Sequence, residues 1–320
     1  MPQFVQVDAG EVSLRVAVEG QGPLVVLVHG FPESWFSWRH QMGPIADAGF
    51  TAAAIDVRGY GGSDKPHAIE AYCMEALTAD VAGVARALQP QAPAILVGHD
   101  WGAPIVWNTA LSRPEAICAV AALSVPYLGV PRRSFRAWFD EVFTAKNRFF
   151  YQAWFQRVGP PEAEAEADVR GFLRKFYYGI CGDAPAGSWP QKAADATLLE
   201  GLADPDPFPG WMTENELDYY VSEFRQSGFR GPINRYRNHD ADFDWMQAFK
   251  DRRIEQPALF ITGTKDPAFN FAGHADPIEV MRGVVPNLRG AHVLEGCGHW
   301  TQQERVREVN DLLIPWLKGL

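Results

Sequence analysis

The sequence is poor in the features that mark metal, redox, nucleic-acid and membrane proteins. Only four cysteines occur among 320 residues, and none forms a Cys-x-x-Cys pair, so we expect no zinc site and no redox pair; they are Cys73, Cys118, Cys181 and Cys297. Basic runs are absent and the net charge is −10, which disfavours nucleic acid and anionic membrane as partners. No apolar run approaches transmembrane length. Residues 1–4 lack the charged and apolar regions of a secretory signal, so we expect a cytoplasmic protein.

Aromatic and apolar residues, in contrast, are plentiful. Hydrophobic residues make up 47% of the chain, which includes 11 tryptophans and 20 phenylalanines. A chain of this length can bury a large core and can carry one domain with an insertion. The aromatic residues therefore indicate either a heavy core or an apolar pocket for an apolar substrate.

Buried strands and helices alternate along the first part of the chain. Residues 12–19 alternate between apolar and polar, which predicts a half-buried strand. Continuous apolar runs predict strands covered on both faces, with helical periodicity between them; the strands are 24–28, 51–57, 94–97 and 117–124, and the helices 35–42, 75–89 and 105–111. This alternation predicts an α/β fold with a mostly parallel sheet flanked by helices.

A helical insertion interrupts this pattern. From about residue 131 to 237 the chain shows helical pieces without a clear buried strand, including one predicted helix at 162–178 and a turn at 205–210. Strands resume at 258–262 and 291–294, and the last helix covers 304–317. We therefore divide the chain into a core, 1–130 and 238–320, and a helical lid, 131–237, inserted after the sixth strand. Such a lid would cover the C-terminal edge of the sheet, where open α/β folds bind ligands.

The stretch 94–104 has the layout of a nucleophile elbow. An apolar strand ends at Val97, a Gly98-His99-Asp100-Trp101-Gly102 turn follows, and a helical segment begins after it. The two glycines suit a strained turn in which neighbouring backbones come close. Asp100 stands where a serine is usual, so the sequence disfavours a serine esterase. A carboxylate there indicates that the enzyme itself becomes the ester.

Two further residues lie at the ends of predicted strands and can serve a nucleophilic carboxylate. His299 follows the last strand, where it could activate water, and Asp266 follows the preceding strand, where it could orient that histidine. We interpret His29 and His99 as structural residues that fix loops. Nearby acidic residues more simply belong to a solvated loop; they are Asp240, Asp242 and Asp244.

A tetrahedral oxyanion needs hydrogen-bond donors. The backbone N–H of Trp101, directly after Asp100, is one candidate, and the N–H of Phe31 is the other. Phe31 precedes Pro32 in a tight turn, for which we expect a cis peptide bond.

The chain carries four notable motifs, which are His29-Gly30-Phe31-Pro32-Glu33-Ser34-Trp35, Asp56-Val57-Arg58-Gly59-Tyr60-Gly61, Gly98-His99-Asp100-Trp101-Gly102 and Gly296-Cys297-Gly298-His299-Trp300-Thr301-Gln302. These motifs resemble those of the epoxide hydrolases of the α/β-hydrolase fold. The chain order Asp100, Asp266, His299 matches the order of that fold. The resemblance covers most of the chain and is weakest from about 180 to 210. It implies an α/β-hydrolase fold with a helical lid and hydrolysis of epoxides to vicinal diols.

The resemblance also implies two tyrosines that polarise the epoxide oxygen. The lid segment 227–238 is similar to the family segment that carries one of them, which corresponds to Tyr236. The other lies in a phenylalanine-rich helix and corresponds to Tyr151. Lid packing is the simpler interpretation of the competing tyrosines, Tyr177, Tyr178, Tyr219 and Tyr220. The family mechanism uses no metal and no cofactor, and we expect pocket contacts from Phe31, Pro32, Trp101 and Trp300.

Several alternatives stay open on the sequence. Haloalkane and fluoroacetate dehalogenases also resemble this chain, and Trp101 could donate its indole N–H to halide. A fluoroacetate enzyme is expected to carry Arg in place of Trp101, and a haloalkane enzyme often has Asn in place of Phe31. A receptor without catalysis could also keep the fold and the pocket. We expect a small apolar epoxide and water as partners of a monomer or homodimer.

Overall fold

The apolar runs form the centre of a mixed sheet in the computed structural model, which describes residues 2–269, 273 and 276–320. The strand order among these residues is β1-β2-β4-β3-β5-β6-β7-β8. Strands β3 to β8 run parallel, and β1 and β2 add an antiparallel edge. The strands are β1 Gln3–Asp8, β2 Ser13–Gly20, β3 Leu24–Val28, β4 Thr51–Ile55, β5 Ala94–His99, β6 Ile117–Leu123, β7 Ala258–Gly263 and β8 Leu288–Leu294. This architecture confirms the predicted α/β-hydrolase fold.

Strand β1 was not predicted, because most of its side chains are exposed and its apolar pattern is weak. It forms by pairing with β2 from Gln3–Val18 to Asp8–Ser13. Strand β8 is also longer than the predicted 291–294, since its side chains are only partly buried.

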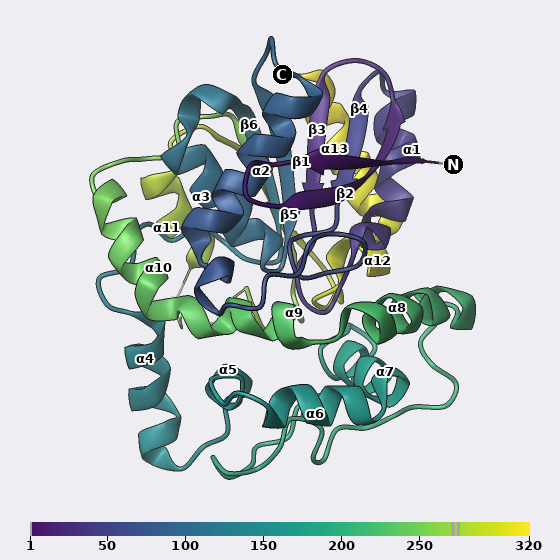
Figure 1. The fold of residues 1–320 in the computed structure, drawn as a ribbon, viewed down its shortest axis with the longest axis vertical. Coiled ribbons are helices and arrows are strands. Elements are labelled where there is room, and N and C mark those ends of the chain that lie inside the picture. Colours follow the sequence, from purple (N-terminus) through teal and green to yellow (C-terminus); the bar gives the residue numbers. More distant parts are fainter. Residues whose placement is uncertain (1, 270–272, 274–275) are drawn as a thin grey trace.

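Helices cover both faces of the sheet (Figure 1). The sheet separates the apolar core into two clusters, one on each face. On one face α1 and α13 pack Ile45 and Leu313 against the strands. On the other face α2, α3 and α11 bury residues such as Val81, Val106 and Met281. These helices are α1 Arg39–Asp47, α2 Met74–Leu88, α3 Gly102–Ser112, α11 Pro277–Val284 and α13 Val306–Lys318, and the short α12 spans Thr301–Glu304. No helix of the described residues is long and apolar enough to cross a membrane.

The helices between β6 and β7 gather at one end of the sheet (Figure 1). They are α4 Phe135–Val142, α5 Tyr151–Trp154, α6 Pro160–Ala167, α7 Val169–Gly179, α8 Glu214–Ser227, α9 Arg230–Asn234 and α10 His239–Met246, with single turns η4 Thr144–Lys146, η5 Arg235–Asn238 and η6 Gln247–Phe249. The insertion after the sixth strand is therefore helical, as predicted.

Two expectations about this region are wrong. The helix predicted at 162–178 is two helices, because the backbone leaves helical geometry at Asp168, whose side chain accepts a hydrogen bond from the Gly171 amide at 3.0 Å and begins α7. The acidic residues around Asp242 form helix α10 rather than a solvated loop, and Asp242 itself is buried. The last helix, in contrast, agrees with the prediction, since α13 covers nearly all of 304–317.

Candidate active site

Asp100 lies on a strained turn between β5 and α3. Its φ of 50° is in the left-handed region, which residues other than glycine uncommonly adopt. The turn is so tight that a Cβ on Gly98 would come closer than 3.0 Å to the carbonyl of Gly102, and a Cβ on Gly102 would do the same to the carbonyl of Val28. Both glycines are therefore required by the close approach, and the turn has the form of the predicted nucleophile elbow.

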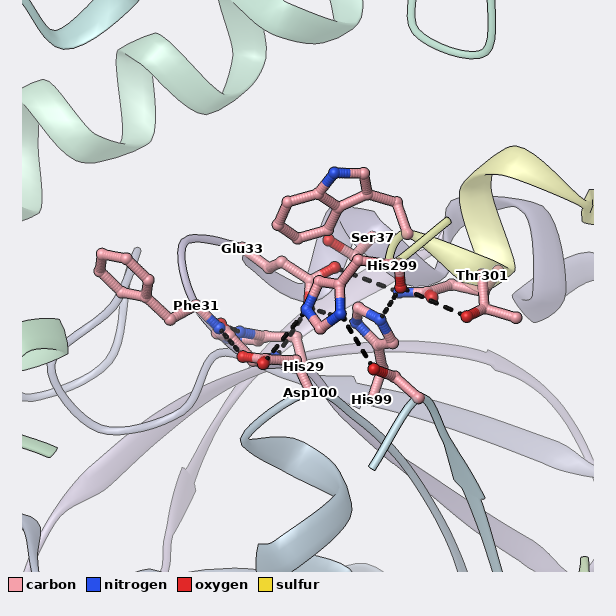
Figure 2. Close-up of polar contacts among 12 residues, drawn as sticks. His29, Phe31, Glu33, Ser37, His99, Asp100, His299 and Thr301 are labelled. Carbon is pink, nitrogen blue, oxygen red and sulfur yellow. Dashed lines mark hydrogen bonds and ion pairs between the residues drawn. The ribbon is translucent and has the colours of Figure 1, made fainter. Parts of the chain in front are cut away.

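The three residues predicted from the ends of the strands come together. His299 Nε2 lies 3.2 Å from Asp100 Oδ2, and His299 Nδ1 lies 2.9 Å from Asp266 Oδ1. Figure 2 shows the Asp100 carboxylate between the imidazole of His299 and the backbone of Phe31. Asp266 is held in turn by the amide of Ala268, which donates to its Oδ1 at 2.8 Å. The histidine thus bridges the two carboxylates.

The two carboxylates control the protonation of His299. Burial alone would lower the pKa of the imidazole, but the charges and hydrogen bonds of Asp266 and Asp100 outweigh it and raise the pKa well above its ordinary value. The two carboxylates therefore favour the imidazolium form of His299 in the resting site. Neutralising either carboxylate would lower the pKa of His299 and free it to accept a proton.

One of the two predicted oxyanion donors already contacts the nucleophile. The amide of Phe31 donates to Asp100 Oδ1 at 2.7 Å, and the Phe31–Pro32 peptide bond is cis, as expected. A Cβ on Gly30 would collide with the Asp100 carboxylate, so glycine lets this loop approach. Among the described residues no such bond joins the Trp101 amide to the carboxylate, although that amide begins the turn into α3.

Beneath these residues lies a buried ion pair that the sequence analysis did not identify (Figure 2). Glu33 Oε2 accepts from the Gly30 amide at 2.8 Å and lies 2.7 Å from His99 Nδ1, and the other ring nitrogen of His99 lies 2.7 Å from the carbonyl of His299. Both His99 nitrogens face acceptors, which fits an imidazolium. Burial opposes both charges, but the pairing raises the pKa of His99 and lowers the pKa of Glu33 to about 2.

This pair ties the loop before Asp100 to the loop that carries His299. The amide groups of Gln302 and Gln303 donate to the second oxygen of Glu33 at 3.1 and 3.3 Å. His29 and His99 have the structural roles that we expected, since His29 accepts the Val57 amide at 3.1 Å. Two features of the sequence could have indicated this pair. His99 directly precedes the nucleophile, and Glu33 follows Gly30 by three residues.

Ser124 is a second residue that the sequence analysis missed. It follows β6, has a φ of 75°, and places its hydroxyl 3.0 Å from His299 Nδ1. The hydroxyl therefore shares that nitrogen with Asp266 and helps to hold the ring. A serine at the end of a predicted strand was the only local signal.

Tyr151 and Tyr236 lie side by side, with ring centroids 5.7 Å apart, and line the same cavity as Asp100. Gln152 Nε2 donates to the Tyr151 oxygen at 2.8 Å, and the Trp101 indole donates to the Tyr236 oxygen. The Tyr236 phenol also forms a hydrogen bond with the Tyr151 phenol, which opposes the rise of the Tyr151 pKa. Burial, then the nearby phenol and carboxylate, raise the pKa of Tyr236, and burial likewise raises the pKa of Tyr151, so both are neutral donors at neutral pH.

The competing tyrosines have other partners. Tyr177 donates to the Pro32 carbonyl at 2.6 Å, Tyr219 accepts the Trp35 indole at 2.6 Å, and Tyr220 bonds Ser37 at 2.8 Å. None of these three lines the main cavity, and Tyr178 does not line it either.

The main cavity has a volume of about 1110 Å³ and contains Asp100, His299, Tyr151 and Tyr236. Phe31 lines it as expected, but Pro32, Trp101 and Trp300 do not. Trp300 is fully buried and donates its indole N–H to the Tyr177 carbonyl at 2.8 Å, so it supports the site from outside. Residues 147–151 and 184–193 form much of the outer wall. The described residues contain no grouping of three or more side chains suited to a metal ion.

Comparisons with known proteins agree on one family. A family model described as the alpha/beta hydrolase fold matches residues 23–158. The chain is 40% identical to Epoxide hydrolase A of Mycobacterium tuberculosis, covering 98% of this chain and 97% of that protein, and 36% identical to Epoxide hydrolase B of the same species, covering 94% and 92%.

Solved structures give the same result. An epoxide hydrolase from an endophytic Streptomyces superposes with a TM-score of 0.93 at 45% identity, covering 100% of this chain and 95% of that one. Epoxide Hydrolase A from Mycobacterium thermoresistibile superposes with a TM-score of 0.92 at 39% identity, covering 100% and 99%.

Proposed function

The chain belongs to the epoxide hydrolases of the alpha/beta hydrolase fold and hydrolyses epoxides, and from this premise we propose that it acts through a covalent ester on Asp100. The observation that carries the proposal is that Asp100, Tyr151 and Tyr236 line one cavity. A nucleophile and two acid protons in one cavity suit a ring that must be attacked at carbon and protonated at oxygen.

In the first step Asp100 attacks a ring carbon, and the bond between that carbon and the epoxide oxygen breaks. Tyr151 and Tyr236 hold the epoxide oxygen, and one of them transfers its proton to that oxygen. The products are an alkyl ester of Asp100, a hydroxyl group and a tyrosinate. The hydrogen bonds that both phenol oxygens already accept stabilise that tyrosinate.

In the second step His299 takes a proton from water, and the water oxygen attacks the carbonyl carbon of the ester. Ester formation has removed the charge of Asp100, so the pKa of His299 falls, the imidazolium passes its proton to the tyrosinate, and the neutral ring becomes a base. The Phe31 amide, which donates to Asp100 at 2.7 Å, and the Trp101 amide hold the oxyanion.

Collapse of the tetrahedral intermediate completes the turnover. The carbonyl re-forms and expels the second diol oxygen, which receives the proton from His299. The regenerated carboxyl group of Asp100 passes its proton to His299, which restores the resting imidazolium. The sum is one epoxide and one water converted to one vicinal diol.

The substrate of this proposal is a small apolar epoxide. Five phenylalanines of the described part of the chain line the cavity, which suits an apolar group. The Trp101 indole is engaged with Tyr236, so halide binding by this group has less support than epoxide opening. We propose that the protein works in a reducing cytoplasm, since its cysteines are free.

We expect the His299→Gln variant to accumulate the ester, because no base remains to activate water. Intact-mass measurement after mixing with styrene oxide should show an adduct of one substrate mass, and Asp100→Ala should show neither adduct nor diol. Diol formation at the wild-type rate by Asp100→Ala would remove the ester from the mechanism. Halide release without diol would transfer the proposal to the dehalogenases.

A further inference from the structure

Arg235 is a buried cation directly before Tyr236. Its side chain is only 4% exposed, and none of our sequence expectations concerned it. The guanidinium forms an ion pair with Asp242 of α10 and donates to the Tyr72 carbonyl. A buried charge is costly to desolvate, so a protein that keeps one at this place calls for a physical reason.

The Arg235 guanidinium lies against Trp101, which links it to the active site. The Arg235 guanidinium sits over the Trp101 ring, 4.6 Å from its centroid. The Trp101 ring meets the Tyr236 ring edge to face at 5.3 Å, and its N–H donates to the Tyr236 oxygen. Arg235, Trp101 and Tyr236 therefore form a continuous chain of contacts that ends in the cavity.

The charge of Arg235 persists at neutral pH. Burial lowers its pKa to about 10, which still leaves the group protonated. His239 also packs against Trp101, at 5.9 Å, but burial and the charges of Arg235 and Arg136 lower its pKa to about 3, so it is neutral. The cationic character of this face of the indole thus comes from Arg235.

We propose that Arg235 is a positioning residue that acts through Trp101 on Tyr236 during ring opening. A cation on the face of an indole polarises it and leaves its N–H more positive, which strengthens the hydrogen bond to an oxygen that is losing its proton. In that step the Tyr236 O–H bond breaks, a new O–H bond forms on the epoxide oxygen, the epoxide C–O bond breaks and the Asp100 ester bond forms.

The same argument distinguishes the two tyrosines. Tyr151 accepts hydrogen bonds from the neutral amide of Gln152 and from Tyr236, whereas Tyr236 accepts from an indole that carries a cation on its face. Arg235 therefore acts on Tyr236 rather than on Tyr151. This inference rests on the proposed role of Tyr236 as a donor.

The test compares ester formation with ester breakdown in charge-balanced variants. Arg235→Met/Asp242→Asn removes both charges, so no unpaired carboxylate is left behind, and Arg235→Lys keeps the cation. Single-turnover reactions with styrene oxide, quenched and read by intact mass, give the two rates. Thermal unfolding checks the fold, and Trp101→Phe provides a second variant that removes the indole N–H without touching the ion pair.

We expect the charge-free double variant to form the ester about ten-fold more slowly, since loss of an adjacent opposite charge shifts a pKa by about 1–3 units and only part of this reaches the rate. Ester breakdown should change less than about two-fold. Arg235→Lys should restore part of the rate, and Trp101→Phe should slow ester formation similarly. In a Tyr236→Phe background the double variant should cause no further loss, whereas in Tyr151→Phe the loss should persist.

An equal loss in the Tyr236→Phe background, or equal slowing of both steps, would show that Arg235 only supports the fold and would overturn the inference. Unchanged ester formation in Tyr236→Phe itself is a different failure, because it would remove Tyr236 from the proposed mechanism. Tyr236→Phe could slow ester formation while Trp101→Phe and the double variant keep the wild-type rate. This result would refute the role of Arg235 and leave that of Tyr236 in place.

Discussion

Replacing Glu33 by Gln removes one charge from the buried pair beneath the nucleophile. The pairing lowers the pKa of Glu33 from 4.5 to about 2. At about 1.4 kcal/mol for each pKa unit, this corresponds to about 3 kcal/mol of the free energy of unfolding. Breaking a buried ion pair from one side costs about 3–5 kcal/mol in other proteins, so the two values agree.

The loss should depend on pH with a definite sign. The pKa of Glu33 is lowered on folding, so its contribution is full above about pH 4.5 and is lost as the pH falls towards 2. The pKa of His99 is raised on folding, so its contribution is full below 6.5 and is lost as the pH rises through the folded-state value. We therefore expect the largest difference between wild type and variant near pH 5–6.

Urea unfolding followed by tryptophan fluorescence, on both proteins at about pH 4, 6 and 9, measures this difference. Glu115→Gln, the same change at an exposed glutamate, is the matched control and should change stability by less than about 0.5 kcal/mol. A loss below about 1 kcal/mol at pH 6, or an equal loss at all three pH values, would refute the assignment of a charged pair to Glu33 and His99.

Two further predictions concern the turn and the tyrosines. Gly98→Ala should lower the free energy of unfolding by about 3 kcal/mol or prevent folding, because its Cβ meets the Gly102 carbonyl. Gly43→Ala, with nothing within 4 Å of its Cβ, should be neutral or slightly stabilising in the same urea unfolding assay, and equal behaviour of the two variants would contradict the steric argument. Tyr151→Phe and Tyr236→Phe should each slow ester formation, and together by about 10²–10⁴-fold, because both acid protons are then lost. Quenched single turnovers measure this, and a double variant that retains the wild-type rate would remove the tyrosines from ring opening.

Local patterns in the sequence were sufficient for much of the fold. The apolar runs that became β3 to β7 are buried on both faces, and their periodicity alone predicted a mostly parallel sheet. The break at Asp168 was not predicted, because an N-cap in the middle of a periodic stretch resembles any other polar residue of a helix. Strand β1 was missed because an exposed edge strand has little apolar pattern.

Within the site, the sequence alone determined the elements that depend on neighbours along the chain. The glycines around Asp100 predict the strained turn, and the positions of Asp266 and His299 after successive strands predict that they meet at one edge of the sheet, since parallel strands end together. The roles of these residues in catalysis remain proposals.

Only the tertiary structure decided which distant residues pair inside the protein. Glu33 meets His99, Arg235 meets Asp242 and Trp101, and residues 184–193 become the wall of the cavity. Sequence patterns report periodic burial, but a buried charge is tolerated only where folding brings a partner within a few ångströms, and no local pattern specifies that partner. The packing of the insertion against the sheet therefore set the charges around Tyr236 and the shape of the cavity, which the motifs themselves left open.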